Sequence, residues 1–297
     1  MATTNVTTAA ETNLSKSANF ARVREIEFVE LFQGDIRKLV EALGITRKIQ
    51  KESGSVLKVM KVTGTLENGA VPEGEIIPLS EYATTWEPIG EITLKKWRKS
   101  TSIEAINDKG YDQAVTATTG KMLKQIQRAI RSDFFSFLAT GTRTATGDGF
   151  QDTLANAWGQ LQVIFEDTDA QPVFFMNPLD VAAYLGSTPA NLATLFGMTY
   201  LENFLGLGDC FLNSDVPQGK IYATVKDNIV LYYVNAATAD ISNGFSFTTD
   251  QTGLIGIHEY PDYDRDTVNN SVVSGIKLFA ENLYGVVVGT IGDTPSA

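Results

Sequence analysis

The chain has 297 residues, enough for one large domain or two modest ones, and at 43% hydrophobic residues it can bury a core. Its formal net charge of −11 at pH 7 argues against a surface built to grip nucleic acid, because such surfaces are generally basic. Cys210 is the only cysteine, which excludes an intrachain disulfide and suits a reducing cytoplasm.

The N-terminal region is predicted to be a tail followed by a helix. Residues 1–19 are small and polar and contain no apolar core, which predicts a flexible tail rather than a secretory signal. Between residues 20 and 43, apolar residues recur at roughly helical intervals, with Gly34 inside the run and Gly44 after it. The pattern predicts either one helix broken at Gly34 or two short helices.

Residues 64–91 are the most unusual segment of the chain. They include six glutamates and no lysine or arginine, and three prolines and four glycines interrupt their apolar residues. Such a segment cannot bury a core, and its prolines and glycines disfavour both a helix and an ordinary sheet. The β-prone stretches 55–63 and 92–100 are predicted to pair antiparallel as a stem. We therefore expect a long hairpin arm that reaches onto another molecule, the alternative being a solvated surface loop.

The predicted arm separates its charges, with six cations on the stem and six glutamates towards the tip. If arms of identical copies overlap tip against base, these charges are complementary. The tip residues expected at contacts between subunits are Glu67, Glu73, Glu75, Glu81, Trp86 and Glu87. The stem cations expected to receive them are Lys95, Lys96, Arg98 and Lys99, and Lys58 and Lys61 complete the stem.

A long helix is predicted to follow, capped by Asn107 or Asp108 and running to about Thr140. Gly120 lies between weak helix formers, so a bend or hinge is expected there. Four cations repeat at helical spacing, and they form either a solvated face or a strip on which a neighbour's acidic tip docks. These cations are Lys121, Lys124, Arg128 and Arg131.

After a predicted loop at 141–150, helices and strands alternate. A helix begins near Asp152, a buried strand follows at 172–176, and Asn177 with Pro178 predicts the start of another helix. Strands are predicted at 220–225 and 228–234, around the turn 226–228, and again near the C-terminus. The stretch 283–292 is too short to span a membrane. The mixture predicts an α+β fold with an antiparallel or mixed sheet.

Taken in order, these elements resemble the major capsid protein of tailed bacteriophages, the Hong Kong ninety-seven type fold. The stretches most similar to that family are residues 70–106, which begin AVPEGEIIPLSEYATTWEP, and residues 205–234, which begin LGLGDCFLNSDVPQGKIYA. The resemblance implies five regions: an N-terminal arm (1–53), an extended loop (54–100), a peripheral domain with a spine helix (101–149), an axial domain (150–270), and returning strands of the peripheral domain (271–297).

The same resemblance implies a function. It implies a shell subunit without enzymatic activity or cofactor, which assembles into hexamers and pentamers of an icosahedral head around double-stranded DNA that it contacts non-specifically. Assembly in the bacterial host cytoplasm, a place in the virion capsid, a portal, a separate scaffolding protein and no membrane partner are expected with it. An encapsulin-like nanocompartment is the alternative, and an enzyme using residues 150–270 is the rival class. The family's lysine-to-asparagine cross-link is not expected, since residues 64–91 contain no lysine.

Catalytic and metal-binding patterns are weak in this sequence. His258 is the only histidine, so it could pair only with Cys210, and we predict a surface or satisfied core residue instead. The stretch 262–273 begins like a calcium loop but has Thr267 in place of the turn glycine, which leaves a solvated acidic loop or a weak cation site. We therefore predict no catalytic, cofactor-binding or metal-ligating residues.

Overall fold

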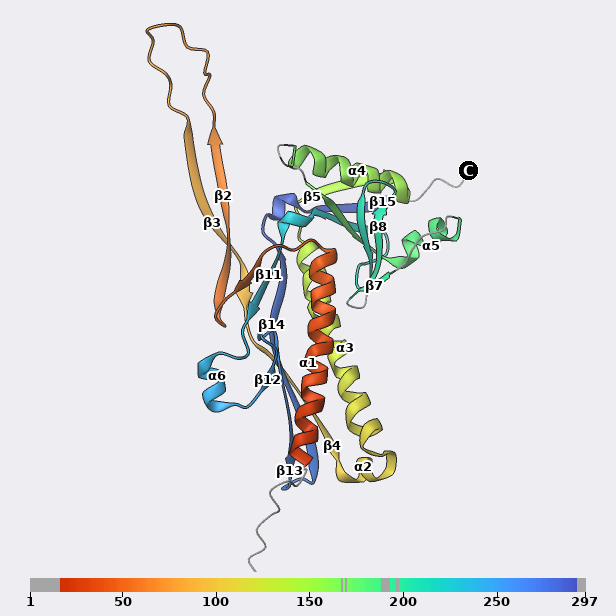
Figure 1. Ribbon diagram of the computed structural model, residues 1–297. Helices are drawn as coiled ribbons and strands as arrows, with labels where there is room; N and C mark the ends of the chain where they lie inside the picture. Colours follow the sequence, from red (N-terminus) through yellow and green to blue (C-terminus); the bar gives the residue numbers. More distant parts are fainter. Residues whose placement is uncertain (1–16, 167, 169, 188–192, 196–197, 293–297) are drawn as a thin grey trace, which may run out of the picture. The chain divides into compact units, whose positions relative to one another are not determined.

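The computed structural model of the protein describes residues 17–166, 168, 170–187, 193–195 and 198–292 (Figure 1). The chain divides into two compact units, each built from several separate stretches. Unit 1 comprises Met1–Gly34, Lys96–Leu123 and Ala236–Ser274, and unit 2 comprises Asp35–Lys95, Lys124–Asn235 and Gly275–Ala297. The predicted tail lies outside the described residues, except for residues 17–19, which are helical. None of the described helices is both long enough and apolar enough to cross a bilayer.

The first helix is continuous, which corrects the prediction of a break. Helix α1 (Ser17–Ala42) passes through Gly34 without interruption. Phe32 and Ile36, on either side of this glycine, are both buried. Glycine inside a helix costs roughly 1 kcal/mol relative to alanine, and the apolar burial on both sides outweighs that cost.

Unit 1 combines helical and strand elements from distant parts of the sequence. The first part of strand β14 (Thr267–Ala280) pairs antiparallel with β13 (Ile255–Asp262), and β13 pairs with the short β12 (Thr248–Thr249). Strand β4 (Lys95–Ser102) also pairs with β14. A short helix, α6 (Ala239–Gly244), precedes β12.

The predicted spine helix starts earlier than expected and is interrupted. Helix α2 (Ile103–Lys109) is capped by Ser102, whose hydroxyl accepts a hydrogen bond from the Ala105 N–H at 3.3 Å. Gly110 ends α2 with a φ of 78°, and a π-helical turn (Asp112–Thr116) leads into α3 (Ala117–Leu138). The predicted spine helix is therefore interrupted at Gly110, while Gly120 lies within the continuous helix α3.

Unit 2 is centred on a seven-stranded sheet with helix α4 (Phe150–Ile164) against it (Figure 1). Residues of α4, including Leu154 and Leu161, form one buried core with residues of the sheet such as Phe174 and Ile221. The strand order is β5 (Arg143–Asp148), β15 (Val287–Gly292), β10 (Lys220–Val225), β6 (Pro172–Met176), β9 (Gly208–Leu212), β8 (Met198–Phe204) and β7 (Ala193–Leu195).

Two local predictions in unit 2 have opposite outcomes. The predicted loop at 141–150 is wrong, because Arg143–Asp148 pairs in parallel with β15 as an edge strand of the sheet. The predicted start of helix α5 (Pro178–Ser187) is confirmed, since the side-chain oxygen of Asn177 accepts a hydrogen bond from the Leu179 N–H at 3.0 Å.

The two strands around residues 226–228 belong to different sheets. Strand β10 joins the seven-stranded sheet, and a 3-10 turn (Lys226–Asn228) leads to β11 (Ile229–Val234). Strand β11 pairs antiparallel with the last part of β14 and in parallel with β1 (Lys48–Gln50). A further 3-10 turn (Leu283–Gly285) precedes β15.

The arm is a hairpin, but its second strand differs from the predicted one. Strand β2 (Ser55–Thr65) pairs antiparallel with β3 (Glu81–Ile92), so the acidic segment itself supplies half of the stem (Figure 1). The register shifts at Leu57 and Lys58, which oppose Gly90 and Pro88 and leave Ile89 without a partner. This bulge explains how Pro88 is accommodated in a strand, since proline is tolerated at bulges and edges.

Candidate assembly surface and buried polar cluster

The hairpin ends in a loop of exposed apolar residues. Residues 66–80 connect β2 to β3, and the Glu67 N–H donates a hydrogen bond to the Ser80 hydroxyl across the base of this loop at 3.1 Å. The exposed fractions of four of its large aliphatic side chains run from 73% to 95%. They are Leu66, Ile76, Ile77 and Leu79.

The glutamates of the hairpin are exposed as well. Trp86, the aromatic residue predicted at the contact, is 61% exposed on β3. Residues 55–92 contain two lysines against six glutamates, so the hairpin as a whole is acidic rather than balanced. The exposed glutamates predicted at contacts are Glu67, Glu73, Glu75, Glu81 and Glu87.

The predicted basic stem is wrong in its second strand, because four of its six cations lie on β4, outside the hairpin, and three of these four have partners within the chain. Lys95 is paired with Asp133. Arg98 donates a hydrogen bond to the side-chain oxygen of Asn269 at 3.3 Å, and the Lys99 ammonium donates to the Val115 carbonyl at 2.9 Å. Burial lowers the pKa of Lys99 from its ordinary value, and the nearby Glu259 opposes this effect. Lys96 is exposed, and no described residue pairs with it.

The four spine-helix cations do not share one exposed face. Lys121 and Lys124 are exposed, and within the described part of the chain neither has an ion-pair partner. Arg128 donates two hydrogen bonds, at 3.0 and 3.1 Å, to one oxygen of the nearly buried Asp215 carboxylate. Arg131 is only 8% exposed, so the predicted docking strip is wrong at this position. Burial lowers the pKa of Arg131, although the Asp215 carboxylate acts in the opposite direction.

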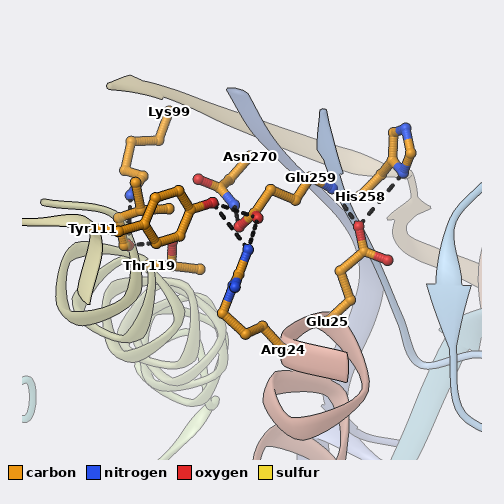
Figure 2. Close-up of polar contacts among 9 residues, drawn as sticks. Arg24, Glu25, Lys99, Tyr111, Thr119, His258, Glu259 and Asn270 are labelled. Atoms are coloured by element: carbon orange, nitrogen blue, oxygen red, sulfur yellow. Dashed lines mark hydrogen bonds and ion pairs between the residues drawn. The ribbon is translucent and has the colours of Figure 1, made fainter. Parts of the chain in front are cut away.

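Unit 1 contains a polar cluster centred on the Glu259 carboxylate (Figure 2). Arg24 from α1 lies 2.6 Å from one carboxylate oxygen, and the Tyr111 hydroxyl donates to the same oxygen at 2.7 Å. The side-chain amide of Asn270 donates to the other oxygen at 2.8 Å. Arg24 also lies 4.6 Å from the centroid of the Tyr111 ring and donates to its hydroxyl at 3.0 Å. The cluster thus joins α1, the start of the spine region, β13 and β14.

These contacts keep Glu259 ionised despite its burial. Burial alone would raise its pKa, but hydrogen bonds from Arg24, Tyr111 and Asn270 lower the pKa of Glu259 below its usual value. Burial would lower the pKa of Arg24, but the hydrogen bond to Glu259, the charge of Glu259 and the contact with Tyr111 together outweigh burial, so the net change is upward. Burial, followed by the Glu259 contact, strongly raises the pKa of Tyr111. The cluster is therefore a buried ion pair in which three side chains hydrogen-bond the Glu259 carboxylate, while Arg24 Nε and Asn270 Oδ1 are buried with no hydrogen-bond partner among the described residues.

A second carboxylate lies beside this cluster. Glu25, the residue after Arg24 on α1, is 5% exposed and accepts hydrogen bonds from the Thr248 hydroxyl and the Glu259 backbone N–H. The ring nitrogen Nδ1 of His258 lies 3.5 Å from the same Glu25 carboxylate, and the His258 ring stacks on Tyr260. His258 is thus a half-exposed residue with a partner, and Cys210 is buried in the other unit.

Sequence reasoning missed this cluster. Arg24 and Glu25 are two of many charged residues in α1, and neither residue indicates its partner 235 or 234 positions away. In the acidic loop, the Asp264 N–H donates to the Asp262 carboxylate at 3.2 Å. Across the described residues, no three histidine, cysteine, aspartate or glutamate side chains are grouped in a way that would hold a metal ion.

Comparisons with known proteins place the fold. No family model matches the sequence, and no curated protein matches it. The capsid protein of a native GTA particle is similar over 84% of this chain and 89% of its own, with a TM-score of 0.54 at 11% identity. The capsid protein of cyanophage A-1(L) is similar over 86% and 92%, with a TM-score of 0.53 at 12% identity.

A shell protein of a different kind is also similar. The holo-SrpI encapsulin complex of Synechococcus elongatus matches over 88% of this chain and 89% of its own, with a TM-score of 0.51 at 14% identity. At these identities the similarity establishes the fold alone. This protein therefore has an α+β fold of the Hong Kong ninety-seven capsid type.

Proposed function

We propose that this protein is the major capsid protein of a tailed bacteriophage. In this proposal, copies assemble into hexamers and pentamers that close into an icosahedral shell around double-stranded DNA. The fold supports a shell subunit, and many modest contacts repeated over a closed shell give large collective stability. The protein has no enzymatic role and needs no cofactor in this proposal.

The uncovered hairpin is the observation that carries this proposal. A two-stranded sheet is marginally stable by itself in water, and residues 55–92 expose seven large apolar side chains. Exposed apolar surface of this extent marks a binding surface in a stable soluble protein. Another subunit of the shell is the partner that would cover it.

The contacts follow from the same assignment. We propose that the hairpin, from Glu67 to Glu87, reaches a neighbouring subunit, and that Lys96, Lys121 and Lys124 are the exposed cations available at the rim of that contact. Gly120 remains the proposed point at which the spine helix bends. The domains proposed for the shell are the arm (1–53), the extended loop (54–100), the axial domain (150–270), and a peripheral domain made of 101–149 and 271–297.

Further partners belong to the proposal. A separate scaffolding protein and a portal would act during assembly in the bacterial cytoplasm, and the mature protein would reside in the virion capsid. With a net charge of −11, the shell would contact packaged DNA non-specifically and weakly.

Electron microscopy and analytical ultracentrifugation test this function. The protein is expressed alone and with its scaffolding protein, and the expected result is closed shells of uniform size. If only small soluble species form under both conditions, the proposed function is wrong.

An encapsulin-like compartment is the second candidate, favoured by the similarity to the SrpI encapsulin complex. Purified particles distinguish the two candidates by their content. Double-stranded DNA inside particles from infected cells supports the phage head, and one co-purifying protein cargo supports the compartment.

A further inference from the structure

The pleat of the hairpin divides its side chains between two different faces. In a strand, alternate residues point to opposite sides, so Tyr82, Thr84 and Trp86 share one face of β3. Glu81 and Glu87 lie on the opposite face. Tyr82 is paired with Gly64, and Glu81 with Thr65, so both faces continue across β2. The hairpin therefore has an aromatic face, defined by Tyr82 and Trp86, and an acidic face, defined by Glu81 and Glu87.

The aromatic face is ordered, because the Tyr82 ring packs against the opposite strand. A Cβ atom added to Gly64 would lie 2.1 Å from the Tyr82 ring, so the ring rests directly over the glycine backbone. An aromatic side chain across a strand glycine covers the backbone and pins the strand register. Tyr82 and Trp86 are nevertheless each 61% exposed, so this ordered face has no cover within the described chain.

Exposed apolar side chains are concentrated in this hairpin. Among the described residues, seven of the exposed large apolar side chains lie in residues 55–92, a segment that is about an eighth of the chain. The base of the hairpin is anchored, since Leu57 and Ile92 are buried in a cluster with Val230, Tyr232 and Phe279. The seven exposed residues are Val56, Leu66, Ile76, Ile77, Leu79, Tyr82 and Trp86.

Charge alone is a poor basis for docking here. Lys95, Arg98 and Arg128, which were predicted to receive the glutamates, are hydrogen-bonded or ion-paired inside their own chain. Burying a glutamate without a partner costs several kcal/mol, whereas burying Trp86 or Tyr82 is favourable. The acidic face is therefore best left in water, and the aromatic face is the one that gains from being covered.

We propose that the aromatic face, together with the aliphatic tip at Ile76, Ile77 and Leu79, docks on a second copy of this chain and anchors it by apolar burial. The glutamates stay hydrated on the opposite face, where they keep the free subunit soluble and meet exposed lysines of the other copy, such as Lys121 and Lys124, only at the rim. This inference rests on the proposed function, which supplies the second copy, and it identifies the face that makes the contact.

Tryptophan fluorescence of the assembled protein tests the proposal directly. The chain has three tryptophans, and the variant Trp97→Phe with Trp158→Phe keeps Trp86 as the only one. On assembly, Trp86 emission is expected to shift to shorter wavelength, and iodide is expected to quench it several-fold less. Shells in which Trp86 stays as accessible as in the free subunit overturn this inference and leave the proposed function intact. Failure of the unaltered protein to form shells overturns both.

A pair of neighbouring substitutions separates apolar burial from charge. Trp86→Ser is expected to raise the concentration needed for assembly by at least about tenfold, which corresponds to about 1.4 kcal/mol, because aromatic anchors dominate the binding energy of interfaces. The matched control is Glu87→Gln on the opposite face, expected to change that concentration by less than about threefold. Thermal unfolding of the free subunit verifies that both variants are folded. If Glu87→Gln impairs assembly as much as Trp86→Ser does, the assignment of faces is wrong.

Discussion

The same residue types, glutamate and aromatic residues, have opposite degrees of burial in the hairpin and in the polar cluster of unit 1. In the hairpin, glutamates are solvated and aromatic rings are exposed. In unit 1, Glu25 and Glu259 are buried, and the Glu259 carboxylate is paired with Arg24 and accepts hydrogen bonds from Tyr111 and Asn270. A buried carboxylate is stable only when charged and polar partners replace water. An exposed aromatic side chain, in contrast, indicates a surface that is covered only on association. The difference separates the residues that stabilise unit 1 from those that we propose to join subunits.

Removal of the Glu259 carboxylate should have the largest effect on folding. Glu259→Ala leaves the Arg24 guanidinium without its ion-pair partner, and breaking a buried pair typically costs about 3 to 5 kcal/mol. The free energy of unfolding, measured by urea titration, should fall by that amount. The control is Glu281→Ala, which breaks the exposed pair with Arg47 and should cost no more than about 1 kcal/mol. Equal losses in the two variants would mean that the unit 1 pair is not buried.

A smaller effect is expected at Arg128, where folding and docking roles can be separated. Arg128→Ala removes both hydrogen bonds to the nearly buried Asp215 carboxylate and should lower the free energy of unfolding by about 1 to 3 kcal/mol. Lys124→Ala, one turn earlier and without an ion-pair partner among the described residues, should change it by less than about 0.5 kcal/mol. Urea titration of the two variants checks this. If the Arg128→Ala subunit is as stable as the wild type but fails to assemble, Arg128 contributes to the contact between subunits and not to folding.

Acid should weaken unit 1 through Glu259. Because the folded state holds the pKa of Glu259 below its unfolded value, the ionised carboxylate adds stability above the ordinary glutamate pKa of about 4.3, and this contribution is lost as pH falls through the folded pKa. Glu259→Gln mimics the protonated form. The difference in unfolding free energy between the wild type and this variant should therefore shrink below about pH 4. A difference that stays constant down to pH 2 would mean that the Glu259 pKa is unshifted.

The smallest effect is expected at Gly120, and it has the opposite sign. A Cβ atom at this position meets nothing within 4 Å, so Gly120→Ala should stabilise α3 by about 0.5 to 1 kcal/mol in thermal or urea unfolding. The matched control, Gly34→Ala in α1, is also free of contacts and should behave alike. Destabilisation at Gly120 alone would show that the spine helix needs a glycine there, as the proposed bend requires.

Much of the fold was predictable because local patterns coincide with it. Asn177 and Pro178 predicted the start of α5, the composition of residues 64–91 predicted an arm, and the order of elements predicted the capsid-type fold that the similar structures establish. The helix boundaries were less predictable. Asn107 and Asp108 were expected to cap the start of the helix, but they lie inside α2. That helix is capped by Ser102 and ends at Gly110.

The sites were less accessible from sequence than the fold. The stretch 92–100 was taken as an arm strand because it is β-prone and matches 55–63 in length, but Lys95–Ser102 pairs with β14 and β3 takes its place in the hairpin. Helical spacing placed Arg131 on a face with Lys121, and tertiary packing buried it. Partner choice between strands, and burial of one residue in a stripe, depend on segments distant in sequence.

By itself, the sequence determined which segments can form helices and strands, where an acidic arm lies between them, and that the net charge is negative. These properties depend on neighbours within a few residues, so periodicity and composition record them. Only the tertiary structure decided that Arg24 and Tyr111 meet Glu259, that β3 rather than β4 completes the hairpin, and that its aromatic and acidic residues lie on opposite faces. Those outcomes depend on pairing between residues far apart in sequence, because a buried polar group is stable only when a hydrogen-bond or ion-pair partner compensates for the loss of water.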